Sequence, residues 1–217
     1  MFSKSRILLA AVLLFGCSPS NIKRDPAYSF APAISNQQLA VCFDRSNAEI
    51  RYPGIFADSP GTAAKQVLLT DLFEQSVLSG IPENTVFKNV VLECSTGEFA
   101  CDTVVVSGFI SFAERKVPVP KKNTHIKFAQ SKPDFALRIS NISISFPAVA
   151  STGVELSSDF VLWDNSLNRA ATYGHVVVID KKRFSGTKED WNAAGDLFVN
   201  RLFEKMPLMK KVPLTRR

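Results

Sequence analysis

The middle of the chain consists of short apolar runs, rich in Val, Ile and Phe, which are separated by polar turns and predict β-strands. In the run 134–146 the apolar residues change phase, because they alternate from 135 to 139 and then alternate out of step from 142 to 146. A β-bulge near Ser140 and Asn141 is expected to reconcile the two halves. Strands are expected at 39–43, 48–52, 85–93, 102–114, 134–146, 157–163 and 171–179.

A helix is expected between the second and the third of these strands. Ser59 fits its N-cap and Pro60 fits its first turn, while Gly80 and Pro82 are typical of a helix end. Apolar residues recur within it at helical spacing, at Val67, Leu68, Leu72 and Phe73.

A second helix is expected to close the domain. Thr187 fits its N-cap, and Asp190 follows three residues later, which is the spacing of a capping box. The helix is expected to end near Met206 and Pro207. One apolar stripe runs along it at i, i+3, i+7 and i+11, formed by Trp191, Ala194, Phe198 and Leu202.

The order of these elements predicts the fold class. Two strands, a helix, a run of strands and a final helix indicate an α+β domain of two layers, with both helices on one face of a mainly antiparallel, twisted sheet. The chain has 217 residues, so removing the first 16 leaves 201, which is typical of one domain with a single core. The domain is expected at 38–206, followed by a basic, flexible tail at 207–217.

The first residues carry the pattern of an export signal. Lys4 and Arg6 precede an apolar run at 7–15, which is too short to span a bilayer. Gly16 supplies the small residue that is needed immediately before a cleavage site. Cleavage there would leave Cys17 as the new N-terminus.

The segment Leu14-Phe15-Gly16-Cys17 resembles the lipobox of bacterial lipoproteins. The resemblance implies removal of residues 1–16 and acylation of Cys17, which would anchor the protein in a membrane. Ser18, in place of Asp, implies sorting to the outer membrane, with the protein facing the periplasm. Residues 17–37 contain several prolines and no sustained apolar period, so they are expected to form the lipidated N-terminus and a flexible linker. The alternative is an ordinary secretory signal whose cysteine is retained.

The charge of the chain indicates little about its ligand. The formal net charge is +6, and removal of Lys4 and Arg6 with the signal lowers it to +4. The basic residues are scattered rather than gathered into one patch with aromatic residues, and export argues against a nucleic-acid partner. This mild positive charge is compatible with anionic headgroups or an acidic partner.

Three cysteines remain in the domain, at Cys42, Cys94 and Cys101. In an oxidising periplasm we expect a disulfide between Cys94 and Cys101, because the six residues between them fit a hairpin loop. Cys42 would then be a buried, unreactive thiol in an apolar run. A zinc site is the alternative, but the chain lacks Cys-x-x-Cys spacing, and only His125 and His175 could complete such a site.

Candidate catalytic groups are few. His125 lies in a polar stretch and His175 lies on a predicted strand, and the chain has no Gly-x-Ser-x-Gly segment. It also lacks a phosphate loop and a dinucleotide fingerprint. We therefore expect a protein without enzymatic activity and without a cofactor or metal. A catalytic role would require one histidine to meet a carboxylate and a nucleophile in one cleft.

The layout of the domain carries a second resemblance. An early helix, a strand-rich middle, a hairpin that contains 160–164 and a closing amphipathic helix are similar to the envelope lipoproteins that share a fold with the N-terminal domain of TolB, including auxiliary lipoproteins of ABC-type transport systems. The resemblance implies an accessory subunit in envelope assembly or transport, which docks onto a protein complex through loops and a sheet edge. Phe56 and Phe99 lie in predicted connections and are the candidate partner-binding residues. The alternative is a carrier that binds a lipid or another apolar ligand between helices and sheet.

Overall fold

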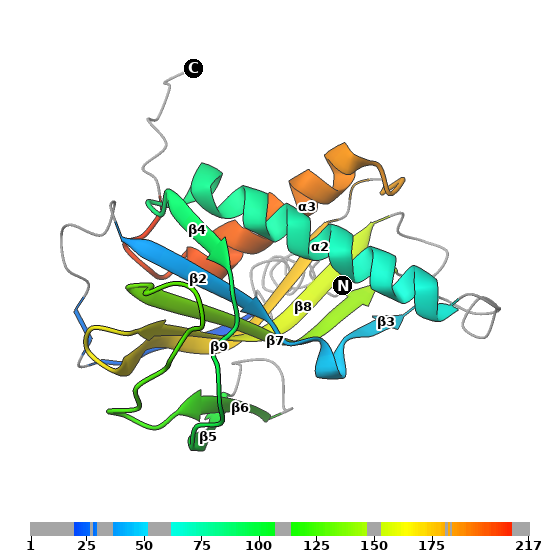
Figure 1. Cartoon of the computed structure of the whole chain (residues 1–217). Coiled ribbons are helices and arrows are strands. Elements are labelled where there is room, and N and C mark those ends of the chain that lie inside the picture. Colours follow the sequence, from blue (N-terminus) through cyan, green and yellow to red (C-terminus); the bar gives the residue numbers. More distant parts are fainter. Residues whose placement is uncertain are drawn as a thin grey trace, which may run out of the picture.

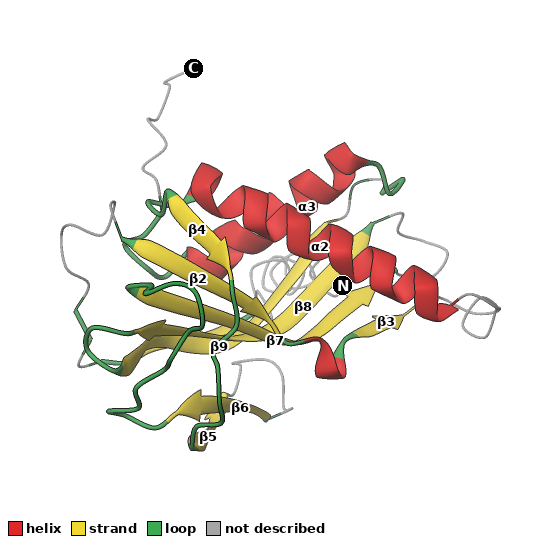
Figure 2. Cartoon of the chain, in the orientation of Figure 1, coloured by secondary structure: helices red, strands yellow, loops and turns green. Residues whose placement is uncertain are grey.

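The computed structural model describes residues 20–26, 28–29, 37–51, 62–106, 114–146, 153–180, 182 and 184–209. Within these residues one β-sheet carries two long helices on one face and a small hairpin on the other (Figure 1, Figure 2). The α+β class is confirmed. The elements in chain order are β1 (Asn21–Arg24), β2 (Gln38–Phe43), the short 3₁₀-helix η1 (Arg45–Asn47), β3 (Glu49–Arg51), α2 (Thr62–Asn84), β4 (Asn89–Leu92), β5 (Cys101–Val106), β6 (Arg115–Pro120), β7 (Phe135–Ser145), β8 (Val154–Asp164), β9 (Arg169–Asp180) and α3 (Lys188–Phe203).

The large sheet is mixed rather than mainly antiparallel. Its strand order is β1-β9-β8-β7-β2-β4, and β3 pairs with the far half of β7. Strands β7, β8, β9 and β1 pair antiparallel, whereas β2 pairs parallel with both β7 and β4. The connection from β2 to β4 contains α2, and a helical crossover returns the chain to the end of the sheet from which it started, which makes the two strands parallel.

The predicted bulge in β7 is confirmed. The register between β7 and β8 shifts between Ser140 and Ser143, and Asn141 has a φ of 50°. Asparagine tolerates this left-handed conformation better than most residues. The extra residue keeps Ile139 and Ile142 in the same core on either side of the bulge.

The predicted linker at 17–37 is wrong in part, because β1 lies within it. Residues 21–24 pair antiparallel with β9, so the folded part of the chain begins before Gln38. Strand β1 contains one apolar side chain, that of Ile22, which is buried. A single apolar residue produces no alternating pattern that could predict a strand. The predicted strand at 102–114 is matched only in part, because β5 ends at Val106 and residues 107–113 lie outside the described residues. Strand β6 was not predicted, because prolines interrupt its apolar alternation.

Helix α2 extends beyond its predicted end. It continues through Gly80 and Pro82 to Asn84, and the Asn84 side chain donates a hydrogen bond to the Gly80 carbonyl oxygen at 2.9 Å. Burial of Ile81 in the core favours this last turn despite the unfavourable residues around it. The predicted cap at Ser59 and Pro60 lies outside the described residues. Of the predicted apolar positions, Phe73 is buried and Leu72 is half-buried, but Val67 and Leu68 are exposed.

Helix α3 matches its predicted start and stripe. The Thr187 hydroxyl accepts a hydrogen bond from the Asp190 backbone, and the Asp190 carboxylate accepts one from the Thr187 backbone, as in a capping box. The helix ends at Phe203, three residues before the predicted end. It packs closely on α2, because a Cβ at Gly195 would lie 2.6 Å from the Ser76 hydroxyl oxygen. The four stripe residues are all buried: Trp191, Ala194, Phe198 and Leu202.

Both faces of the sheet carry apolar clusters. The larger cluster joins the sheet to α2 and α3 and includes Phe73, Phe160 and Phe198. The smaller one lies on the other face, where Val117 of the β5–β6 hairpin packs against Trp163 of β8. The hairpin therefore covers part of the second face, and described residues elsewhere on that face line two open pockets.

Candidate functional site

A disulfide joins Cys42 to Cys94, with the two Cα atoms 4.6 Å apart. Cys42 lies in β2 and Cys94 follows β4, which is the parallel neighbour of β2. The predicted pairing of Cys94 with Cys101 is wrong. That prediction assumed that the strands before and after the loop form one hairpin, whereas β4 and β5 belong to different sheets.

Cys101 carries a free thiol at the start of β5. Burial raises the pKa of this thiol above its usual value, so it is mainly protonated at neutral pH. It faces an open groove of about 530 Å³, which we call the disulfide groove. The residues that line the groove are Cys42, Phe43, Asp44, Arg45, Cys94, Ser95, Gly97, Glu98, Phe99, Cys101 and Arg138.

The disulfide groove is lined by two arginines and by two acidic residues, Asp44 and Glu98. Arg138 donates to the Asp44 carboxylate at 2.5 Å, and Arg45 donates to the Glu74 carboxylate on α2 at 2.6 Å and 2.5 Å. Burial alone would raise the pKa of Asp44, but hydrogen bonds from Ser46 and Arg138 hold it below its usual value. Both guanidinium groups remain partly exposed, so they can still contact a partner.

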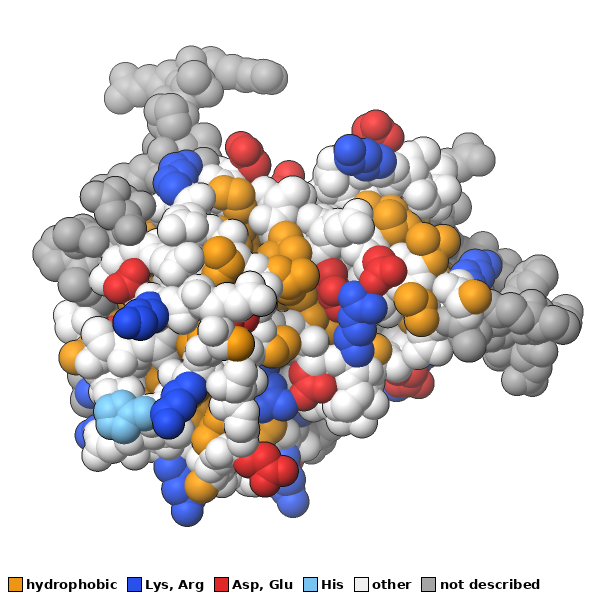
Figure 3. Space-filling view, in the orientation of Figure 1, with side chains coloured by type: hydrophobic (Ala, Val, Ile, Leu, Met, Phe, Trp, Pro, Cys, Tyr) orange, Lys and Arg blue, Asp and Glu red, His pale blue; other side chains and the backbone are white. Residues whose placement is uncertain are grey.

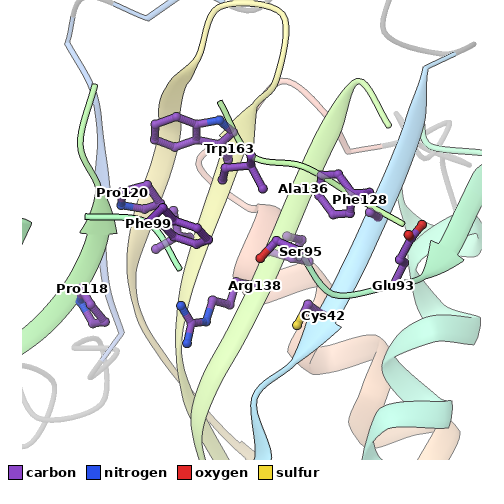
Figure 4. A pocket seen from close by; sticks show the side chains of 14 residues that line it. Cys42, Glu93, Ser95, Phe99, Pro118, Pro120, Phe128, Ala136, Arg138 and Trp163 are labelled. Atoms are coloured by element: carbon purple, nitrogen blue, oxygen red, sulfur yellow. The ribbon is translucent and has the colours of Figure 1, made fainter. Parts of the chain in front are cut away.

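Phe99 lies at the boundary between the disulfide groove and a small apolar cavity under the hairpin. Figure 4 shows its ring beside Pro120, on the side of the sheet that carries Arg138 and Trp163. The cavity has a volume of about 40 Å³, and Phe99 is half-buried. The structure thus places Phe99 in a surface that a partner could reach from the groove. The other two predicted site residues, Phe56 and Cys17, lie outside the described residues.

A second cluster of polar groups lies on the same face of the sheet, around Asp159 of β8. The Asp159 carboxylate is 1% exposed and is bonded by His175 Nδ1 at 2.8 Å, Arg115 Nε at 2.8 Å and Asn141 Nδ2 at 2.7 Å. Burial alone would raise its pKa, but the hydrogen bonds from His175 and Asn141 and the charge of Arg115 hold the pKa below its usual value. Asp159 of β8 therefore binds side chains from three other strands: Arg115 of β6, Asn141 in the bulge of β7, and His175 of β9.

This cluster partly meets the requirement that we set for catalysis. His175 contacts a carboxylate, and Ser143 and Ser157 line the same pocket of about 380 Å³. Within the described part of the chain, however, no hydrogen bond joins His175 to a serine hydroxyl. His125 is exposed in a loop, away from this pocket. Sequence reasoning missed the cluster, although an Asp within a strand that is followed by the apolar run 160–163 is a signal of a buried polar contact.

The described residues contain no group of three or more His, Cys, Asp or Glu side chains that could hold a metal ion. None of the helices described is both long enough and apolar enough to cross a membrane.

Comparison with known proteins gives distant structural matches. Two solved structures of PelC dodecamers from Paraburkholderia phytofirmans match with TM-scores of 0.39 and 0.36. The first is 10% identical in sequence, and the alignment spans 87% of this chain and 98% of the PelC chain. The second is 9% identical, over 84% of this chain and 96% of the PelC chain. The hypothetical protein CT253 from Chlamydia trachomatis matches with a TM-score of 0.31 and 12% identity, over 76% of this chain and 91% of its own.

The sequence comparisons give no match. No protein-family model matches the chain. No curated protein matches it either. The resemblance to the N-terminal domain of TolB and to transport auxiliaries stays a prediction.

Proposed function

We propose that this protein is a non-catalytic lipoprotein that acts as an accessory subunit in envelope assembly or transport. Lipidation of Cys17 would hold it at the outer membrane, facing the periplasm. The lipobox-like residues 14–17 support the anchor. The observation that carries the docking function is the open edge of β4, which continues directly into the disulfide groove.

This edge has the features of a peptide-binding strand. Among the described residues, β4 pairs with β2 on one side and with no strand on the other. Leu92, its last residue, is 60% exposed, and Cys94 is bonded to β2 two residues later. The disulfide fixes the end of the edge strand, so a partner strand could pair with β4 without unravelling it.

Exposed apolar side chains lie at the edge and on the helix that covers this side of the sheet. Leu92 ends β4, and α2, which packs against β4, exposes Val67 and Leu68 further along, beside β3, where Gln66 donates to the Ala48 carbonyl oxygen at 2.8 Å. Figure 3 shows apolar side chains on the face of the molecule that β4 and α2 form. An exposed apolar surface next to arginine and phenylalanine side chains is typical of a binding surface for another protein.

The carrier alternative receives less support. Pockets that bind drug-sized ligands typically have volumes of about 300–1,000 Å³. The apolar cavity beside Phe99 has a volume of about 40 Å³, which is room for little more than one or two water molecules. The large disulfide groove is open and lined by charged residues, which fits a protein surface better than a lipid chain.

The anchor and the docking surface can be tested separately. Radiolabelled palmitate should enter the wild-type protein in cells, and Cys17→Ser should abolish labelling and release the protein from membranes. A photoreactive amino acid at Leu92 should crosslink to a defined envelope protein, whereas the same amino acid at the exposed Leu167, in the β8–β9 turn, should not. Equal crosslinking at the two positions would reject the β4 edge as the docking surface.

A further inference from the structure

We propose that the protein rests against phospholipid headgroups with the β1–β9 edge of its sheet, at the opposite end from β4. The inference rests on the proposed anchor at Cys17. It adds the orientation of the domain and names the residues that contact the bilayer.

The first argument is the length of chain between the anchor and the sheet. Three peptide units separate Cys17 from Ser20, so their Cα atoms lie at most about 11 Å apart. The Ser20 hydroxyl donates to the Val177 carbonyl at 2.9 Å and accepts from the Val177 amide at 2.9 Å. Arg201 of α3 donates to the same hydroxyl at 3.2 Å. Acyl chains on Cys17 would therefore enter the bilayer close to Val177 of β9.

The second argument is the kind of side chain that surrounds this point. Ile179 is 49% exposed and lies about 7 Å from Val177, two residues further along the strand. Leu197 is 45% exposed and lies one helical turn before Arg201, on the same side of α3. Both apolar side chains thus flank the place where the anchored chain leaves the sheet.

The third argument is charge. Lys205 is exposed just beyond the end of α3, and Lys182 is exposed just beyond the end of β9. Among acidic groups, Glu155 lies opposite Ile179 on β8 and is half-buried, and Glu204 pairs with Arg201. Asp180 is buried and accepts from the Lys182 backbone. The excess of basic over exposed acidic groups around two apolar side chains is suited to a surface of anionic phospholipids.

The orientation sets the height of the docking surface. Strands β1 and β4 are the two ends of the order β1-β9-β8-β7-β2-β4, so five strand spacings separate them. At about 4.8 Å per spacing, the open edge of β4 would stand roughly 24 Å from the β1 edge. The partner would therefore be met on the side of the domain that faces away from the membrane.

The test uses full-length protein, purified with its lipid from cells and reconstituted into vesicles of phosphatidylethanolamine and phosphatidylglycerol that contain a headgroup-nitroxide lipid. A small fluorescent amino acid is placed at Ile179, Leu197 or Leu92. These three exposed positions are matched in side-chain type, and Leu92 is the control at the far edge. We expect quenching at Ile179 and Leu197 to be about threefold stronger than at Leu92.

A second variant carries a flexible insertion of ten Gly and Ser residues between Ser18 and Pro19, which should reduce this difference while the protein still floats with the vesicles. If the protein floats but all three positions are quenched equally, or Leu92 is quenched most, the proposed orientation is wrong and the anchor stands. If the protein takes up no palmitate and does not float, the proposed anchor fails and the orientation fails with it.

Discussion

Removing the disulfide between Cys42 and Cys94 should destabilise the protein strongly, because the bond closes a long loop. The two cysteines are 52 residues apart in sequence. The loop-closure relation gives about 4 kcal/mol at 25 °C for a loop of this length. With a urea dependence of about 2 kcal/mol per molar, the double variant Cys42→Ala/Cys94→Ala should unfold at roughly 2 M less urea than the wild type.

The matched control is Cys101→Ala, which removes the free thiol and leaves the disulfide intact. It should cost about 1 kcal/mol or less. If Cys94 were instead bonded to Cys101, the ring would be short, the loop-closure stabilisation would be about 2.5 kcal/mol, and Cys101→Ala would remove it. Urea unfolding of the three proteins, with a non-reduced digest to identify the bonded peptides, separates the two cases. A loss under about 1 kcal/mol in the double variant would refute the loop argument.

Three further changes follow from close contacts and buried charge. Gly195→Ala should destabilise the protein by about 1–3 kcal/mol in thermal or urea unfolding, because the new Cβ would meet Ser76 at 2.6 Å; unchanged stability would show that the helices separate easily. Gly174→Ala would put a Cβ 2.1 Å from the Asn21 carbonyl oxygen, so the backbone amides of β1 should exchange at least about tenfold faster, while those of β7 and β8 stay protected. An unchanged exchange rate in β1 would contradict this packing. Asp159→Asn should cost roughly 3 kcal/mol at pH 7. Because the pKa of Asp159 is lowered in the folded protein, its charge stabilises the fold above about pH 4, and this stabilisation is lost as the pH falls through the lowered pKa. The stabilities of the variant and the wild type should therefore converge in acid. A stability difference that does not change with pH would refute the role of that charge.

Local signals in the sequence were sufficient for α3 and for the bulge in β7. The Thr187 cap and the apolar stripe of α3 depend on residues within a few positions of one another, and the same is true of the phase change at Asn141. The structure of such segments is dictated mainly by neighbours in sequence.

Contacts between segments that are far apart in the sequence could not be predicted from such local patterns. The spacing of Cys94 and Cys101 favours a local bridge, and nothing near Cys42 indicates that β2 and β4 become neighbours. Strand β1 has too few apolar residues to produce a pattern, and its place is decided by β9. The cluster at Asp159 likewise forms only when β6, β7 and β9 come together.

The pairing of β1 with β9 sets the order in which the chain can be assembled. Ser20 and Val177 are separated by 157 positions, so the first strand to leave the ribosome finds its partner only after nearly all of the chain has been synthesised. The meander β7-β8-β9 is built from neighbouring segments, whose short loops close at a lower entropic cost than the roughly 4 kcal/mol expected for so distant a contact. We therefore expect β1 to pair with β9 last during folding, after the centre of the sheet has already formed.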